Sequence, residues 1–275
     1  MLKLRKYDDY EEFKSDVLPH LYKHEVENNL PIGILGSLTE ESTIYLMATI
    51  TRDEEMLIVL LQTHPKQIII SRPPEMSDEE AVEIAKLIRD QVENIPGLIG
   101  ERDFTDKAVN IIDKSNFFVQ MNQRIYELTK VKKEADTNGK LRLVTMEDLS
   151  VVKQWVYLFC EEADEKISLE ESEEKAIAII KNERMYAWET DGRIVTMACI
   201  SRPTRTNICI SLVFTPLENR KKGFASSCVS ALSQLMLDKG YKTTSLYTDL
   251  DNPTSNKIYM EIGYEPIMDS ILYRK

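Results

Sequence analysis

The sequence predicts an α+β protein, in which a mixed, mostly antiparallel sheet flanked by helices is preceded by a second α/β domain. Two observations predict this. In residues 141–275, strand-like apolar segments follow one another through short turns, and a single strand–helix–strand crossover comes after them. Before this region, a polar stretch that culminates in Asn138-Gly139 has the composition of a linker. We therefore expect two domains, residues 1–135 and 139–275.

The first domain alternates strand and helix patterns. A helix is expected at 78–93 because Ser77 can cap it, Glu80 follows three residues later, and the apolar residues after them recur at helical spacing. The other expected elements are strands at 43–50, 56–61, 67–71 and 117–128 and a helix at 106–114.

The second domain is expected to begin with a strand and two helices and to continue with an antiparallel run. Asp191-Gly192 between two apolar segments is typical of a hairpin turn, and Gly240 is placed to end the amphipathic helix before it. The expected strands are 141–145, 185–190, 193–201, 207–215 and 243–248, with a final pair at 264–266 and 270–273; the expected helices are 147–162, 170–181, 224–238 and 254–262.

The composition excludes several classes of function. The 275 residues carry a net charge of −11, and broad nucleic-acid binding would instead need clustered Lys and Arg over a large face. The apolar run at 56–61 is too short to cross a bilayer, and residues 1–13 lack the apolar core of a secretion signal. We therefore expect a cytoplasmic protein that binds neither nucleic acid nor membrane.

The cysteines and histidines show no metal or redox pattern. No two cysteines have C-x-x-C spacing, so we expect reduced thiols and no metal site. The histidines all lie in the first domain and are assigned no catalytic role. These residues are Cys160, Cys199, Cys209, Cys228, His20, His24 and His64.

Three consecutive cations stand just before a predicted helix. Arg220, Lys221 and Lys222 precede Gly223 and the helix at 224–238, where positive charge is unfavourable because the helix dipole is positive at that end. A bound phosphate or pyrophosphate would remove the conflict. The alternative is a solvated basic turn. Neither G-x-x-x-x-G-K-[ST] nor G-x-G-x-x-G is present.

Two motifs in this region resemble those of the GNAT superfamily of N-acetyltransferases. Arg220, Gly223 and Ala225 match the acetyl-CoA loop pattern [QR]-x-x-G-x-[GA]. About thirty residues later, "TDLDNPTSNKIYMEIGYEPI" is similar to the second half of the same signature. That half is carried by Asn252, Asn256, Tyr259, Gly263 and Tyr264. The resemblance covers residues 139–275.

The resemblance implies that acetyl-CoA is the co-substrate and that no metal is needed. The strand before the loop would pair with the pantetheine amides, and the loop N–H groups would hold the pyrophosphate. The residues implied in cofactor binding are Val213, Phe214, Thr215, Arg220, Lys221, Lys222, Gly223, Phe224, Ala225, Ser226, Asn252, Asn256 and Tyr259. Lys221 departs from the pattern, because the family often has glycine there. It can supply its N–H unless φ must be positive.

The resemblance also implies a catalytic role for Tyr259, as proton donor to the leaving thiolate; the alternative is an ordinary packed tyrosine. Glu162 is our candidate for the general base, although Glu161, Asp249 and Asp251 remain open and each could be a solvated surface carboxylate.

The first domain resembles the non-binding half of two-domain members of the superfamily. Its strand–loop–helix at 68–88 is like a degenerate copy of the phosphate loop, in which Pro73 and Pro74 supply no N–H and no glycine is present. We therefore predict an N-acetyltransferase that acts on an amine of a small molecule or peptide. The alternative is a CoA-binding regulatory or interaction module without turnover.

Overall fold

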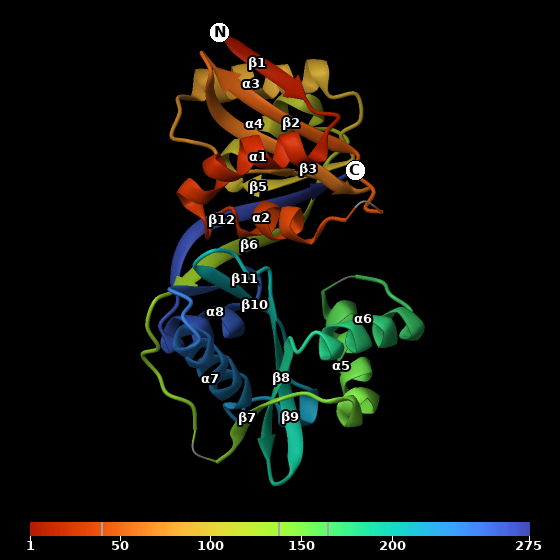
Figure 1. Cartoon of the computed structure of the whole chain (residues 1–275), viewed down its shortest axis with the longest axis vertical. Coiled ribbons are helices and arrows are strands. Elements are labelled where there is room, and N and C mark those ends of the chain that lie inside the picture. Colours follow the sequence, from red (N-terminus) through yellow and green to blue (C-terminus); the bar gives the residue numbers. More distant parts are fainter. Residues whose placement is uncertain (40, 137, 164) are drawn as a thin grey trace. The chain divides into compact units, whose positions relative to one another are not determined.

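The computed structural model describes residues 1–39, 41–136, 138–163 and 165–275 (Figure 1). Contacts between Cα atoms divide the chain into two units. Unit 1 consists of Met1–Tyr126, Thr248–Pro253 and Pro266–Lys275, and unit 2 of Glu127–Tyr247 and Thr254–Glu265. Within the described residues, every helix is too short or too polar to span a membrane.

Unit 1 is a sheet with helices on both faces. The strands are β1 (Leu2–Lys6), β2 (Leu46–Arg52), β3 (Glu55–His64), β4 (Gln67–Ile70), β5 (Gly97–Glu101), β6 (Phe118–Leu128) and β12 (Glu265–Arg274). The helices are α1 (Tyr10–Leu21), α2 (Asn29–Ser37), α3 (Asp78–Gln91) and α4 (Arg102–Asp113). The strands lie in the order β1-β2-β3-β4-β5-β12-β6. Neighbours are antiparallel from β1 to β4, and β4 and β5 are parallel.

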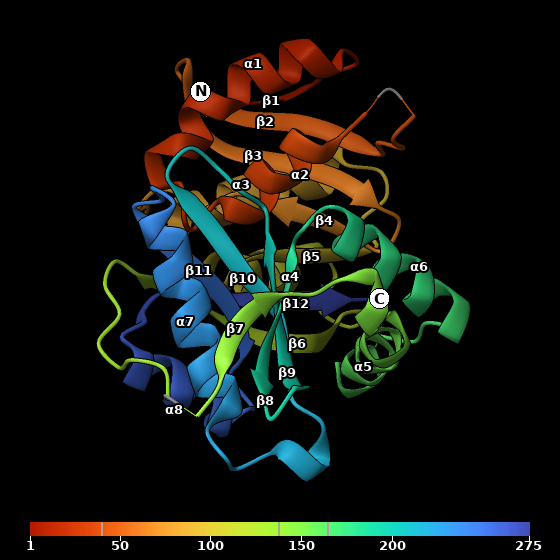
Figure 2. The ribbon, with the colours of Figure 1, turned by 60° about the horizontal axis from the view of Figure 1, so that its bottom comes forward.

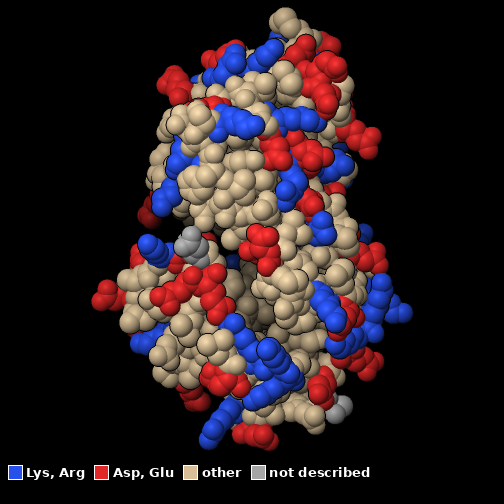
Figure 3. Space-filling model, turned by 180° about the vertical axis from the view of Figure 1, so that it is seen from behind, with Lys and Arg blue, Asp and Glu red and all other residues tan. Residues whose placement is uncertain are grey.

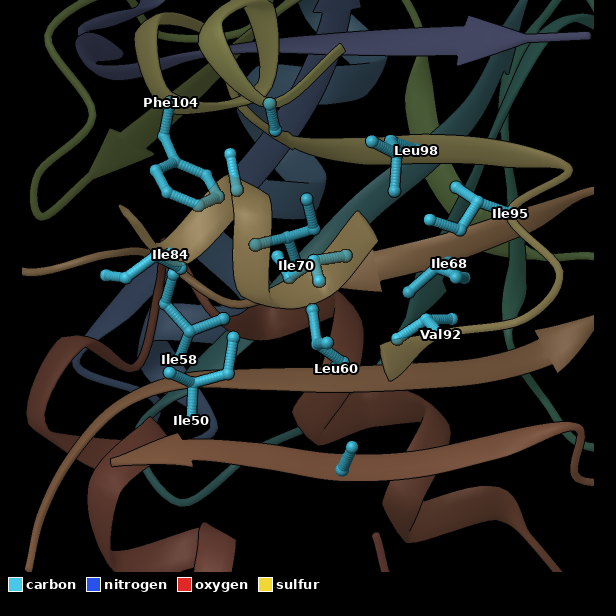
Figure 4. Packing of buried hydrophobic residues seen from close by; sticks show 14 of the residues in the cluster. Ile50, Ile58, Leu60, Ile68, Ile70, Ile84, Val92, Ile95, Leu98 and Phe104 are labelled. Atoms are coloured by element: carbon cyan, nitrogen blue, oxygen red, sulfur yellow. The ribbon is translucent and has the colours of Figure 1, made fainter. Parts of the chain in front are cut away.

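Helix α3 forms where its cap and its periodicity place it. The Ser77 side chain accepts a hydrogen bond from the backbone N–H of Glu80, and the buried face of the helix packs with α4 on strands β2 to β5 (Figure 4). Helices α1 and α2 pack on the opposite face, where Phe13 and Leu35 contact Met47 and Val59. The alternation of side chains along β3 thus supplies both cores.

Unit 2 contains five strands, which lie in the order β7-β8-β9-β10-β11. The strands are β7 (Lys140–Leu143), β8 (Met185–Thr190), β9 (Arg193–Ser201), β10 (Asn207–Phe214) and β11 (Thr243–Asp249), and the helices are α5 (Leu149–Glu162), α6 (Leu169–Lys181), α7 (Phe224–Asp238) and α8 (Pro253–Ile262). Strands β7 to β10 are antiparallel and β10 and β11 are parallel.

Both faces of the unit 2 sheet are covered by helices. Met185 and Ala187 of β8 pack with α5 and α6, whereas Tyr186 and Trp188, the residues between and after them, point to the other face. Helix α7 covers that second face, and Lys239 at its end donates a hydrogen bond to the Tyr186 hydroxyl. Figures 1 and 2 both show α5 and α6 on one side of β8 and α7 on the other.

The two halves of the chain have the same order of elements. In chain order, β1 to β6 and β7 to β12 each run strand, two helices, three strands, helix, strand, helix, strand, and in each half a parallel strand pair flanks the third helix. The mixed, mostly antiparallel sheets flanked by helices confirm the predicted fold class.

Strand β12 extends the sheet of unit 1, although it follows the elements of unit 2 in the sequence. It pairs with β5 in antiparallel register from Ser270 opposite Glu101 to Arg274 opposite Gly97. Arg124 of β6 forms a bidentate ion pair with Asp269 of β12, with N–O distances of 2.6 and 2.8 Å. The predicted strand pair at 264–266 and 270–273 is therefore wrong, because one continuous strand pairs with β5.

The contacts divide the chain differently from the expected domains, 1–135 and 139–275. Residues 266–275 and 248–253 cluster with unit 1, and the segment 127–136 clusters with unit 2. A fragment of residues 139–275 would therefore contain β12 without its partner β5 and would lack the segment before β7.

Candidate functional site

Strand β10 contains an irregularity near its end. The register with β9 shifts between Ser211 and Phe214, and Leu212 has a φ of 52°, a value that bulky residues rarely adopt. The parallel register between β10 and β11 runs from Asn207 opposite Thr243 to Ile210 opposite Leu246. The backbone of Val213 and Thr215 lies beyond that paired stretch.

The loop after β10 has a backbone suited to an anion. Lys221 has a φ of 63° and Gly223 a φ of 81°, while Lys222 between them is not in the left-handed region. Such alternation turns successive N–H groups toward one point and forms the concave arrangement called a nest. Gly223 is also the N-cap of α7, and no side chain caps that helix. Within the described chain, no acceptor meets the N–H groups of residues 221–226.

The cations of this loop differ in what they contact. The Arg220 side chain turns back on the strand end: its Nε donates to the Thr215 carbonyl oxygen at 2.8 Å, and its guanidinium lies 5.8 Å from the centre of the Phe214 ring. Lys221 and Lys222 are exposed. Figure 3 shows Lys and Arg side chains gathered beside a hollow in the surface.

Glu162 is the last residue of α5 and pairs with Arg220. Its carboxylate accepts a hydrogen bond from the Arg220 guanidinium, and both side chains are partly exposed. The structure thus brings together the candidate base and the first residue of the loop motif. Glu161 beside it accepts a hydrogen bond from the Tyr157 hydroxyl at 2.8 Å.

Helix α8 carries Asn256 and Tyr259 on its buried face. Burial raises the pKa of Tyr259 to about 12, against the opposing effect of a hydrogen bond with Ser255. The phenol therefore keeps its proton through the neutral range. Gly263, with a φ of 121°, ends the helix.

The ring of Tyr264 packs against the ring of Tyr259. The two rings meet edge to face with their centres 6.1 Å apart. The Tyr264 hydroxyl lies 2.8 Å from Ser233 Oγ on α7 and 2.8 Å from Thr244 Oγ1 on β11. Burial raises the pKa of Tyr264 far above its usual value, so these hydrogen bonds persist at neutral pH. The sequence reasoning missed this network, because its partners are 20 and 31 residues away.

Asn252 lies in the turn before α8, where its N–H donates to the Asp249 carbonyl oxygen at 3.1 Å. This turn belongs to the segment Thr248–Pro253 of unit 1, whereas the other residues of the predicted site belong to unit 2.

The corresponding loop of unit 1 is closed by its own residues. Ser77 caps α3, three acidic residues fill its first turn, and Pro73 and Pro74 lack an N–H. Just after β4, the N–H of Arg72 donates to Asn28 Oδ1 at 2.7 Å. The end of β4 is thus engaged by a side chain of the α1–α2 connection, and the loop has no backbone cradle for an anion.

The other reactive groups do not form a site of their own. All four cysteines are free and buried, and burial raises the pKa values of Cys199 and Cys228 to about 12, so neither is a thiolate at neutral pH. In the part of the chain that the structure describes, no three His, Cys, Asp or Glu residues are placed to hold a metal ion.

The sequence and the fold are similar to those of known proteins. Residues 150–264 match the model of the acetyltransferase (GNAT) family. No curated protein matches the sequence. A GNAT-family acetyltransferase from Colwellia psychrerythraea, 11% identical, has a TM-score of 0.63, and the match covers 99% of this chain and 100% of that one.

Two further solved structures match over nearly their whole length. A GCN5-related N-acetyltransferase from Sphaerobacter thermophilus is 13% identical with a TM-score of 0.63, covering 100% of this chain and 95% of that one. A tandem GNAT protein from the clavulanic acid biosynthesis pathway is 10% identical with a TM-score of 0.57, covering 100% and 98%. Residues 150–264 therefore match the model of the GNAT acetyltransferase family, a family of acyltransferases, and the whole chain shares the fold of the tandem GNAT protein.

Proposed function

We propose that unit 2 transfers an acetyl group from acetyl-CoA to an amine of a small molecule or peptide. The observation that carries the proposal is the nest at Lys221 to Gly223, which opens α7 without a side-chain cap and follows the irregular end of β10 after a short 3-10 turn, Leu217–Asn219. Unpaired N–H groups at a helix N-terminus are suited to a pyrophosphate. In this proposal Lys221 and Lys222 add charge attraction.

Strand β10 would align the other end of the cofactor. The backbone beyond Ile210 is past the register with β11, so Val213, Phe214 and Thr215 can pair with the amides of an extended pantetheine arm. Phe224, Ala225 and Ser226 complete the first turn of α7, and their N–H groups point toward its N-terminus. Asn256 on α8 and Asn252 before it are the remaining proposed contacts.

When bound, acetyl-CoA supplies a thioester carbonyl that a neutral amine can attack. Tyr259 is proposed to donate a hydrogen bond at the sulfur. An ordinary thiol has a pKa near 8.5, about 3 to 4 pH units below that of Tyr259, so complete proton transfer from the phenol would be uphill. Its contribution is therefore expected to be a hydrogen bond to the developing thiolate, and solvent protonates the product.

Glu162 is proposed to attract the acceptor and to take its proton. A carboxylate at the end of α5 favours a cationic amine, but the ion pair with Arg220 must open first. Exposed ion pairs contribute only about 0.2–1 kcal/mol, so a phosphate group that competes for Arg220 can release Glu162.

A second function, CoA binding without turnover, is favoured by that same ion pair, since Glu162 is engaged and Tyr259 is buried. In that case the site would bind acetyl-CoA and signal through a conformational change or a partner.

The experiment measures CoA-thiol release from acetyl-CoA with a panel of primary amines, comprising spermidine, an aminoglycoside and a lysine-containing peptide. Amine-dependent release that is lost in Gly223→Glu supports the transferase, because the added carboxylate repels a pyrophosphate. Stabilisation by acetyl-CoA without release with any amine supports the binding module. If acetyl-CoA neither stabilises the protein nor is consumed, both proposals are contradicted.

A further inference from the structure

Residues 130–136, in the connection between β6 and β7, are bound to helices α7 and α8. We call residues 130–136 the strap. The N–H of Lys132 donates to the Ile262 carbonyl oxygen at 2.7 Å, and the Lys133 ammonium pairs with Glu261 at 2.8 Å. Both acceptors are in the last turn of α8, where backbone carbonyls lack partners within the helix. The strap therefore closes the C-terminal end of α8.

The strap also contacts α7. Ser230 Oγ donates to the carbonyl oxygen of Lys133, and the N–H of Asp136 donates to Ser227 Oγ at 3.1 Å. Ser227 and Ser230 are 6% and 1% exposed, so the strap satisfies hydroxyl groups that water barely reaches. Lys133 thus bonds to α8 through its side chain and to α7 through its backbone.

The close approach of the strap depends on a glycine. A Cβ at Gly263 would stand 2.9 Å from the carbonyl oxygen of Lys130 and 3.0 Å from the Lys132 side chain. Together with its φ of 121°, this leaves room for glycine only. The end of α8 is therefore shaped to receive the strap.

We propose that the strap is a positioning element for acyl transfer, which holds the helix of Tyr259 against the helix that begins at the phosphate-binding loop. This inference rests on the proposed function. Figures 1 and 2 both show α7 and α8 side by side. A displacement of about 1 Å at a reacting centre can lower a rate about a hundredfold, so small shifts between these helices matter for catalysis. The strap acts through Tyr259 and touches no reacting group itself.

The test replaces the two serines that face the strap. The Ser227→Ala/Ser230→Ala double variant removes both hydrogen bonds to α7, while alanine favours the helix itself. Ser230→Thr keeps a hydroxyl and should rescue the Ser230→Ala single variant. The matched control is Ser172→Ala, which removes a hydroxyl that donates to the Leu169 carbonyl oxygen at 2.7 Å on α6, away from the strap.

The kinetic parameters distinguish positioning from general support of the fold. We expect kcat to fall by about 10-fold or more in the double variant, with KM for acetyl-CoA changed by less than about twofold, and no change in Ser172→Ala. In a Tyr259→Phe background the same substitutions should lower kcat by less than about twofold, because a lost hydroxyl can no longer be misplaced.

The outcomes separate the inference from the function on which it rests. If the wild-type protein releases CoA with no amine in the panel, the proposed function fails and the positioning role fails with it. If the wild type turns over but kcat falls equally with and without the Tyr259 hydroxyl, or does not fall, the positioning role alone is overturned. Should the double variant unfold below the assay temperature, Ser230→Ala and Ser230→Thr give the same comparison.

Discussion

Replacing Gly223 with alanine tests the nest with the smallest possible side chain. The φ of 81° at this position costs an alanine about 1–2 kcal/mol, and the lower entropy of its unfolded chain returns about 0.4–1 kcal/mol. A Cβ at Gly223 would meet no atom within 4 Å, so no internal clash adds to this. We expect the free energy of unfolding without ligand to fall by about 1 kcal/mol.

The effect on acetyl-CoA binding should be larger. At a concentration a hundred times its Kd, a ligand of the native state raises the free energy of unfolding by about 2.7 kcal/mol. The added methyl group would stand in the open space over the N–H groups that are proposed to hold the pyrophosphate. If the affinity falls a hundredfold, the same concentration adds only about 0.4 kcal/mol.

The assay is chemical denaturation with and without acetyl-CoA, and Gly192→Ala is the matched control. Gly192 has a φ of 72° and also has no atom within 4 Å of a Cβ, but it lies in the β8–β9 hairpin turn, away from the proposed nest. The control should lose similar intrinsic stability and keep the whole gain from acetyl-CoA. A Gly223→Ala variant that also keeps the whole gain would refute the assignment of the nest to the cofactor.

Three further predictions concern the proposed chemistry. Tyr259→Phe should lower kcat by about 10- to 150-fold, the equivalent of a 1.5–3 kcal/mol hydrogen bond to a charged group, with acetyl-CoA affinity unchanged in calorimetry; an unchanged kcat when chemistry limits the rate would remove the hydroxyl from the mechanism. Because burial raises the pKa of Tyr259 to about 12, its contribution to stability is complete below about pH 10 and is lost toward pH 12; denaturation across that range should show a loss about 2–3 kcal/mol larger in the wild type than in Tyr259→Phe, and equal losses would contradict the buried phenol. Glu162→Gln should raise acetyl-CoA affinity by up to about fivefold by freeing Arg220, and a weaker affinity in calorimetry would argue against competition for that side chain.

The sequence predicts the elements of the fold best where local signals agree. The helix expected at 78–93 is present as Asp78–Gln91, because its cap and its apolar spacing both act within a few residues. The strands and helices expected between 141 and 262 are present with shifts of a few residues at their ends. The order of these elements also follows from the sequence.

Elements that depend on distant contacts were not predictable. No expectation covered β1, α1, α2 or β5; α2 contains Pro31 and Gly33, which are unfavourable within a helix. In β5, a Cβ at Gly97 would stand 2.4 Å from the Lys66 carbonyl oxygen, so this glycine is required by a neighbouring segment rather than by its own strand. A hydrophobic pattern indicates that residues 265–274 form a strand but does not say which sheet they join.

The candidate site also has features that the local sequence predicts and features that it does not. The motif placed the residues of the loop, but the φ of 63° at Lys221 became apparent only with the backbone. The family often has glycine at this position, and here the position takes a positive φ. Lys221 therefore adopts its backbone conformation at a free-energy cost that glycine would not have. The Arg220–Glu162 pair joins residues 58 positions apart and leaves no local sequence signal.

Strand β12 has a consequence for how the chain is made. The ribosome synthesises β1 to β6 first, but the strand that lies between β5 and β6 emerges only after all the helices and the other strands of unit 2. At about 5–20 residues per second, the gap is on the order of ten seconds, during which the edges of β5 and β6 have no β12 between them. Unpaired edges of this kind are where nascent chains aggregate or recruit chaperones. Loss of β12, Glu265–Arg274, would therefore damage the unit that was translated first.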